Sequence, residues 1–209
     1  MKNKLTITIP ENWNEIPLNK FLILQNDLKA YEDDEEAQIH LMLYHLCGIT
    51  TEIINGLSTQ SYNELKNTLL SFMGNTDFNL QRIIQIDGEE YGFEPNLSNM
   101  SYGAYADITK FNELKIDKNW PKIMSILYRK VKSRNGETYT IEPYEGIIDD
   151  TKFLALPMSI HFGALFFFVN LSKKLVSFTL NSLMEKEEVP HNIKPILARS
   201  GEVMQQLLS

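Results

Sequence analysis

The sequence predicts an α+β fold that is mainly helical. Apolar residues three and four positions apart recur along the 209-residue chain, and this is the periodicity of helices buried on one face. A β-hairpin is predicted over about residues 82–93, because Asp87-Gly88 separates two β-rich runs and both turn residues tolerate positive φ. The most apolar segment, residues 154–171, predicts a long apolar helix toward the carboxyl end, packed with the other helices as a bundle.

The elements of the amino-terminal part follow from local signals. Apolar and polar residues alternate over residues 5–9, which predicts a short, half-buried N-terminal strand. Pro17 is predicted as the first residue of a helix that reaches about Tyr31, since proline is well tolerated there. The acidic residues 32–36 favour the start of a second helix through the helix dipole, and Gly48 ends it.

Three further helices and a turn are predicted in the middle of the chain. The helices are expected over residues 58–72, 101–111 and 121–127, the first two of them beginning at serine residues that can act as N-caps. Asn135-Gly136 marks a turn before a short β-like run at residues 138–141.

The chain length suits one domain with a substantial core. We expect a single α+β domain over residues 1–188. Pro190 and Pro195 then interrupt helical structure, so residues 189–209 are expected to form a C-terminal arm.

The long apolar segment also raises the question of a membrane. Its eighteen residues are at the short end of a bilayer span. The sequence after it continues as an apolar stripe interrupted by Lys173, Lys174, Ser177 and Asn181, which is amphipathic and not a membrane exit. We therefore expect a helix covered by its own fold and by a partner protein. Its candidate interaction residues are Phe166, Phe167 and Phe168.

Composition excludes some classes of function. A net charge of −7 and a pI near 5.2 argue against a protein that coats nucleic acid or anionic lipid over its whole surface. Cys47 is the only cysteine, so it cannot form a disulfide within the chain, and a reducing compartment fits best. Nothing at the amino terminus resembles an export signal.

The sequence contains no motif that commits to a reaction. Its ten glycines form no phosphate-binding loop, and His40 and His45 are spaced by five, which turns them apart on a helix. His161 is interpreted as a buried neutral histidine bonded to a backbone carbonyl, with a catalytic or pH-sensitive imidazole as the alternative. We therefore predict no catalytic, cofactor-binding or metal-binding residue.

Basic residues are concentrated in residues 110–134, where eight basic residues stand against two acidic ones. One interpretation is a solvated region whose lysines balance acids of the same fold. The other is a positive face that binds an acidic partner, a second copy of the chain or nucleic acid. The candidate interaction residues of that face are Lys122, Arg129, Lys130, Lys132 and Arg134.

The order of features resembles a class of small virion-morphogenesis proteins of tailed bacteriophages, several of them tail-assembly-chaperone-like. The resemblance extends from about Leu5 to Leu171. It is based on the segment from Trp13 to Leu18, the hairpin, residues 100–107, and the Leu156–Ser159 entry into an aromatic-rich helix.

This resemblance implies a non-enzymatic protein without a cofactor, located in the host cytoplasm during assembly or retained in the virion. The implied partner is a structural protein such as the tape-measure or tail-tube protein, or another copy of the chain, and not a membrane or nucleic acid.

Two alternatives stay open. The first is a small regulator that binds a host protein or nucleic acid through residues 110–134. The second is an enzyme whose site is assembled from distant residues, with Tyr128, Glu142 and His161 as candidate members.

Overall fold

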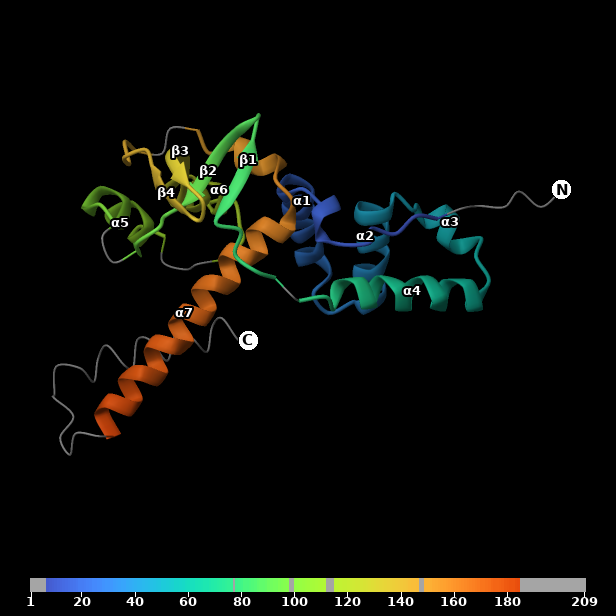
Figure 1. Cartoon of the computed structure of the whole chain (residues 1–209). Helices are drawn as coiled ribbons and strands as arrows, with labels where there is room; N and C mark the ends of the chain where they lie inside the picture. Colours follow the sequence, from blue (N-terminus) through green and yellow to red (C-terminus); the bar gives the residue numbers. More distant parts are fainter. Residues whose placement is uncertain (1–6, 77, 98–99, 112–114, 147–148, 185–209) are drawn as a thin grey trace.

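A computed structural model describes residues 7–76, 78–97, 100–111, 115–146 and 149–184. The described chain is α+β, as predicted, with helices and one antiparallel sheet. Helices α1 to α4 lie on one side of the molecule, and the sheet with α5 and α6 lies on the other (Figure 1). The long helix α7 starts between these two groups.

The amino-terminal helices form where capping residues predict them. Asp34 accepts a hydrogen bond from the backbone N–H of Ala37, and Gly48 ends the same helix with a φ of 69°, which is readily accessible only to glycine. Ser58 caps the next long helix in the same way as Asp34. The bounds are α1 Leu18–Leu28, α2 Glu35–Cys47, α3 Thr51–Asn55 and α4 Thr59–Met73.

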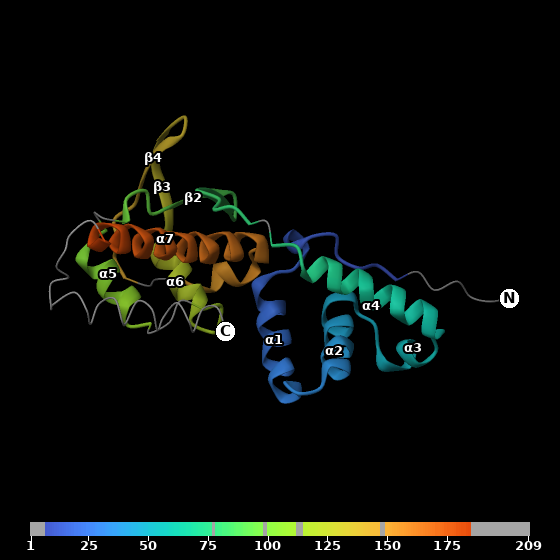
Figure 2. The same cartoon turned by 90° about the horizontal axis from the view of Figure 1, so that it is seen from below.

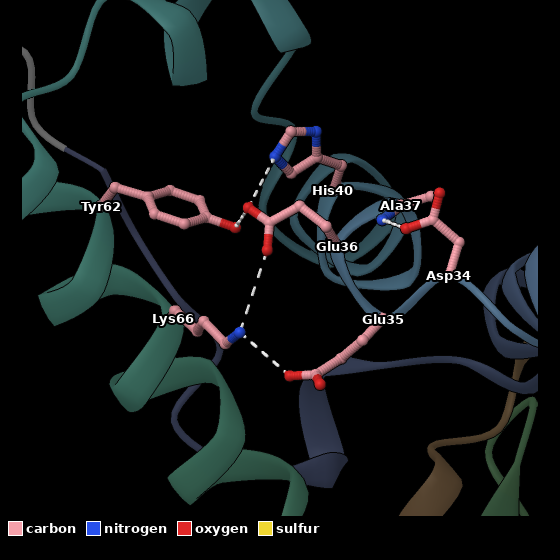
Figure 3. Close-up of polar contacts among 7 residues, drawn as sticks. All are labelled: Asp34, Glu35, Glu36, Ala37, His40, Tyr62 and Lys66. Atoms are coloured by element: carbon pink, nitrogen blue, oxygen red, sulfur yellow. Dashed lines mark hydrogen bonds and ion pairs between the residues drawn. The ribbon is translucent and has the colours of Figure 1, made fainter.

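Polar contacts join α2 to α4 (Figure 3). Lys66 of α4 places its Nζ 3.0 Å from a carboxylate oxygen of Glu35 and 3.9 Å from one of Glu36. The hydroxyl of Tyr62 donates to Glu36 at 2.5 Å, and burial together with this carboxylate raises the pKa of Tyr62. His40 lies 3.7 Å from Glu36. These contacts connect the two helices at their exposed edge.

The sheet has four strands in the order β1-β2-β3-β4, all antiparallel. The predicted hairpin is confirmed, because Asp87 and Gly88 connect its strands with φ values of 53° and 81°. The second hairpin turns at Gly136, whose φ of 59° suits the first central position of a two-residue loop. The bounds are β1 Ile83–Ile86, β2 Glu89–Phe93, β3 Tyr128–Asn135 and β4 Thr138–Ile141.

The remaining helices are α5 Tyr102–Thr109, α6 Trp120–Leu127 and α7 Met158–Met184. A small antiparallel bridge between Pro17 and Pro157 precedes both α1 and α7. In it, Leu18 donates its backbone N–H to Leu156 at 3.0 Å, and Met158 donates to Ile16 at 2.8 Å. The prediction that Pro17 is the first helical residue was therefore wrong by one position.

Helix α7 passes very close to the segment that leads into β1. A Cβ atom added at Gly163 would lie 2.5 Å from the carbonyl oxygen of Asn79, so only glycine allows this approach. The last turns of α7 then extend away from all other labelled elements in Figure 1, and Figure 2 shows the same helix from a direction in which it passes over α6 and α5. In the part of the chain that the structure describes, no helix combines the length and hydropathy needed to cross a membrane.

The predicted N-terminal strand and the predicted C-terminal arm lie at the two ends of the chain. Residues 7–10 form no strand, although Ile7 and Ile9 are half-buried against the core and Thr8 is exposed. The predicted alternation in burial is thus present, but these residues pair with no strand. Residues 1–6 and the predicted arm 189–209 lie outside the described residues.

One cluster of buried apolar side chains connects the helical group with the sheet. It extends from Leu43 and Leu69 in α2 and α4, through Met158 at the start of α7, to Trp120 and Tyr128 beside the sheet. Burying such side chains stabilises the fold by about 1.5–3 kcal/mol each.

Candidate functional site

Strand β3 holds four of the five basic residues predicted to form an interaction face. Glutamates in β2 or directly after it pair with three of them: Arg129 with Glu94, Lys130 with Glu89 at 2.6 Å, and Arg134 with Glu90 at 2.8 Å. For these three residues, the geometry matches the interpretation that basic residues balance acids of the same fold. Lys122 lies apart from them, on α6.

Lys132 is placed differently because β3 is irregular there. Val131 faces Ile141 and Ser133 faces Thr140, so Lys132 is an extra residue in a β-bulge. Bulges re-aim side chains and are frequent beside binding sites. Lys132 is exposed and forms no ion pair with the described residues.

A cleft of about 530 Å³ lies beside this bulge. Its walls come from the start of β3, from residues 142–146 after β4 and from residues 149–153 before α7. The charged residues in its lining are Arg129, Lys130, Lys132, Glu142, Glu145, Asp149 and Lys152, and its aromatic residues are Tyr91, Tyr128, Tyr144 and Phe153.

Lys152 is held on one wall of the cleft. Its Nζ donates to the hydroxyl oxygen of Tyr91 at 3.0 Å and lies 3.3 Å from Asp149. These contacts, that of Tyr91 first, raise the pKa of Lys152. The hydroxyl of Thr151 and the ammonium of Lys152 lower the pKa of Asp149.

Two further side chains of the cleft, Lys130 and Tyr144, also have raised pKa values. The carboxylate of Glu89 raises the pKa of Lys130. Burial and a 2.5 Å hydrogen bond to Asp107 raise the pKa of Tyr144. A lysine nucleophile or a tyrosine base requires a lowered pKa, so these shifts suit binding by fixed charges and not proton transfer.

Arg129 is the one buried cation of the cleft. Its side chain is 12% exposed and that of its partner Glu94 is 9% exposed. The Nη2 atom pairs with Glu94, but Nε is buried and has no hydrogen-bond partner. An unsatisfied buried donor costs about 1–3 kcal/mol, so the unpaired Nε offsets part of the stabilisation that the ion pair provides.

His161 lies outside the cleft, fully buried under it. The indole Nε1 of Trp120 can only donate, so its 3.1 Å contact makes Nδ1 of His161 the acceptor. Nε2 therefore carries the proton and donates to the Phe153 carbonyl at 3.1 Å. Burial lowers the pKa of His161 to about 4, as expected for a neutral structural histidine.

The candidate enzyme site is therefore not assembled as one unit. Tyr128 and Glu142 both line the cleft, but the hydroxyl of Tyr128 donates to the Gln81 carbonyl at 2.6 Å, and His161 is separated from the cleft. Among the described residues, no group of three or more histidine, cysteine, aspartate or glutamate side chains could hold a metal ion.

The three candidate phenylalanines of α7 pack on the chain itself. Phe166 stacks on Phe78, with ring centroids 5.6 Å apart, and Phe167 and Phe168 both contact Phe93. All three are only half-buried. Phe167 also lines a second hollow, of about 400 Å³, at the carboxyl-terminal end of β2.

Sequence reasoning found Arg129, Lys130 and Lys132 but missed Tyr144 and Lys152, which no local pattern marks. Comparison of the chain with family models, with curated proteins and with solved structures gave no match.

Proposed function

We propose that this protein is a non-enzymatic bacteriophage virion-assembly protein that binds another virion protein, in the manner of a tail-assembly chaperone. The resemblance in the order of features supplies the class of protein. The observation that carries the proposal is the course of helix α7, whose last turns leave the body of the molecule (Figure 1).

The sequence of this projecting part favours a protein partner. Six of its last ten residues, 175–184, are apolar. A projecting helix of this composition is stabilised when a partner covers it, since each Å² of apolar area removed from water contributes about 25 cal/mol. Helix-to-helix contact with a long helical chain such as a tape-measure protein suits this shape.

A hollow at the base of this projecting part extends the proposed binding surface. It is lined by Leu97, Phe167 and Leu171 together with the carboxyl-terminal end of β2, beside the point where α7 leaves the sheet. A partner helix that follows α7 would reach this hollow.

The electrostatics of the cleft support the non-enzymatic part of the proposal. The pKa values of Lys130, Tyr144 and Lys152 are raised and that of Asp149 is lowered, so these four cleft groups are shifted away from proton exchange near neutral pH.

The test uses the full chain with the proteins encoded beside it, among which the proposal requires a tape-measure or tail-tube protein. Co-expression and light scattering on a sizing column should give a complex with one of them. The substitution Ser177→Pro should abolish this complex, because proline breaks the helix at a cost of about 3 kcal/mol. Ser177→Ala is the matched control and should bind as the wild type does.

Circular dichroism separates loss of binding from loss of folding. Since Ser177 lies in the projecting part, the main thermal transition of Ser177→Pro should stay at the wild-type temperature. Binding unaffected by Ser177→Pro, or a monomer that ignores both neighbouring proteins, would refute the proposal.

A further inference from the structure

The dipeptide Asn-Gly occurs twice in the chain, at residues 55–56 and 135–136. Asparagine is chemically labile, and most so before glycine, because the missing Cβ lets the side-chain carbonyl carbon approach the next peptide nitrogen. Both asparagines and both glycines are exposed, so water reaches both dipeptides. Exposure therefore does not distinguish the two places, and the backbone around each of them does.

The second dipeptide lies at the turn between β3 and β4. Asn135 ends β3 and pairs with Thr138, the first residue of β4. Figure 2 shows this turn standing clear of the other labelled elements. The carbonyl of Gly136 accepts a hydrogen bond from Arg134 Nε at 3.0 Å, but the N–H of Gly136 donates to no acceptor among the described residues. The nitrogen that the Asn135 side chain would attack is therefore free.

The first dipeptide is held in the opposite way, at the end of helix α3. Gly56 donates its N–H to the carbonyl of Glu52 at 3.2 Å and to that of Ile53 at 3.1 Å. Ile54, directly before Asn55, is buried in the core. The nitrogen after Asn55 is therefore committed to the helix, and the residue on the other side of Asn55 is anchored.

The motion that ring closure requires also differs between the two places. The side chain reaches the next nitrogen only after rotation about the Cα–C bond of the asparagine, which changes its ψ. At Asn135 this rotation opens only the last pair of a hairpin, beside the turn, and such ends open at low cost [BP3]. At Asn55 it breaks the hydrogen bonds of Gly56 and pulls on the buried Ile54.

We propose that Asn135 is a modification site, at which the side chain closes onto the nitrogen of Gly136 and deamidates without an enzyme. A bond forms between Cγ of Asn135 and the Gly136 nitrogen, and the bond from Cγ to the side-chain NH2 breaks. The proton of the Gly136 nitrogen leaves with this group as ammonia. One water molecule then opens the cyclic imide at either carbonyl, which gives aspartate or isoaspartate. Water is the only co-reactant, and nothing is oxidised or reduced.

The product differs from the original turn in charge and in backbone length. Either product adds a negative charge next to Arg134. Isoaspartate also places one more carbon atom in the backbone, so the pair of residue 135 with Thr138 loses its register. The reaction at Asn135 is independent of partner binding through α7.

Peptide mass spectrometry of the full chain, incubated at pH 8 and then digested at acidic pH, measures both rates. Each deamidation raises the peptide mass by about 1 Da. In the folded protein, Asn135 should react about tenfold faster than Asn55. In urea the two rates should come within about threefold of each other, because the hydrogen bonds of α3 no longer protect Asn55.

Two matched variants assign the reaction to one residue. Asn135→Gln keeps the amide but requires a six-membered ring, which closes much more slowly, so the early mass increase of the whole protein should disappear. Methylation by a protein isoaspartyl methyltransferase should disappear with it. Asn55→Gln should leave both signals unchanged. Neither substitution changes the net charge, and circular dichroism should show the wild-type thermal transition for both.

Three results would overturn the proposal. They are equal rates at Asn55 and Asn135 in the folded protein, an Asn135 that stays intact in the folded protein while the urea-unfolded chain reacts, and an early mass increase that persists in Asn135→Gln.

Discussion

The buried histidine makes folding depend on pH in a way that can be isolated. In the folded protein, His161 accepts from Trp120 through Nδ1 and has no exposed surface, and its pKa is lowered by burial from 6.5 to about 4. The unfolded chain takes up this proton near pH 6.5 and the folded protein only near pH 4. Between these values the unfolded state binds more protons, so the free energy of unfolding falls as the pH falls.

The size of this effect follows from the pKa values. At 1.36 kcal/mol per pH unit, His161 removes about 3 kcal/mol of stability between pH 6.5 and pH 4, and it has no such effect above pH 6.5. The perturbation that tests this is His161→Leu. It should cost about 2–5 kcal/mol at pH 7, because Trp120 Nε1 and the Phe153 carbonyl lose their partners.

Urea unfolding followed by circular dichroism at 222 nm, repeated at intervals from pH 4 to pH 8, measures both effects. Carboxylates also titrate in this range, but they do so in both proteins, and the difference between wild type and variant isolates His161. We expect the stability difference to be largest above pH 6.5 and to shrink by about 3 kcal/mol toward pH 4. A difference that does not change with pH would refute the neutral, buried assignment of His161.

Three further predictions concern the sheet and its charges. Arg129→Met should lower the free energy of unfolding by about 3 kcal/mol in urea titrations, because it leaves the mostly buried Glu94 unpaired. Lys130→Ala removes one partner of an exposed ion pair and should change the free energy of unfolding much less. Equal effects of the two substitutions would contradict this prediction. Gly92→Ala should lower the melting temperature, since its Cβ would lie 2.5 Å from the Tyr139 ring. Gly103→Ala should raise the melting temperature or leave it unchanged, because Gly103 lies in a helix and its added Cβ would be 3.6 Å from the Tyr144 ring, an ordinary contact distance. Fluorescence anisotropy should detect no DNA or RNA binding at 150 mM salt, because glutamates in or directly after β2 neutralise three β3 cations. Salt-dependent binding that Lys130→Ala and Arg134→Ala weaken would favour the regulator alternative.

Local signals were enough to predict most of the helices. Ser58 and Ser101 cap helices where serine N-caps are predicted, the helix predicted after the acidic residues 32–36 begins there, and Gly48 and Asp87-Gly88 occupy the left-handed backbone regions that their positions require. These features depend on a few neighbouring residues, which are visible in one sequence.

Strand β3 could not be recognised in the same way. Its sequence, residues 128–135, is rich in lysine and arginine, and three of these side chains pair with glutamates in or directly after β2 that are 35 to 44 residues away in the chain. One signal was present, because the turn at Asn135-Gly136 implies a strand on each side and only residues 138–141 were assigned one. The cleft depends on this pairing, so its geometry could not be predicted without β3.

Arg129 connects the cleft with the root of helix α7. It lines the cleft, and its partner Glu94 lines the hollow beside Phe167 and Leu171. Glu94 occupies Nη2 of Arg129, whereas Nε is the donor left without an acceptor. Because one side chain contributes to both places, loss of the Arg129 guanidinium would leave the Glu94 carboxylate without its ion-pair partner in the wall of the hollow beside α7.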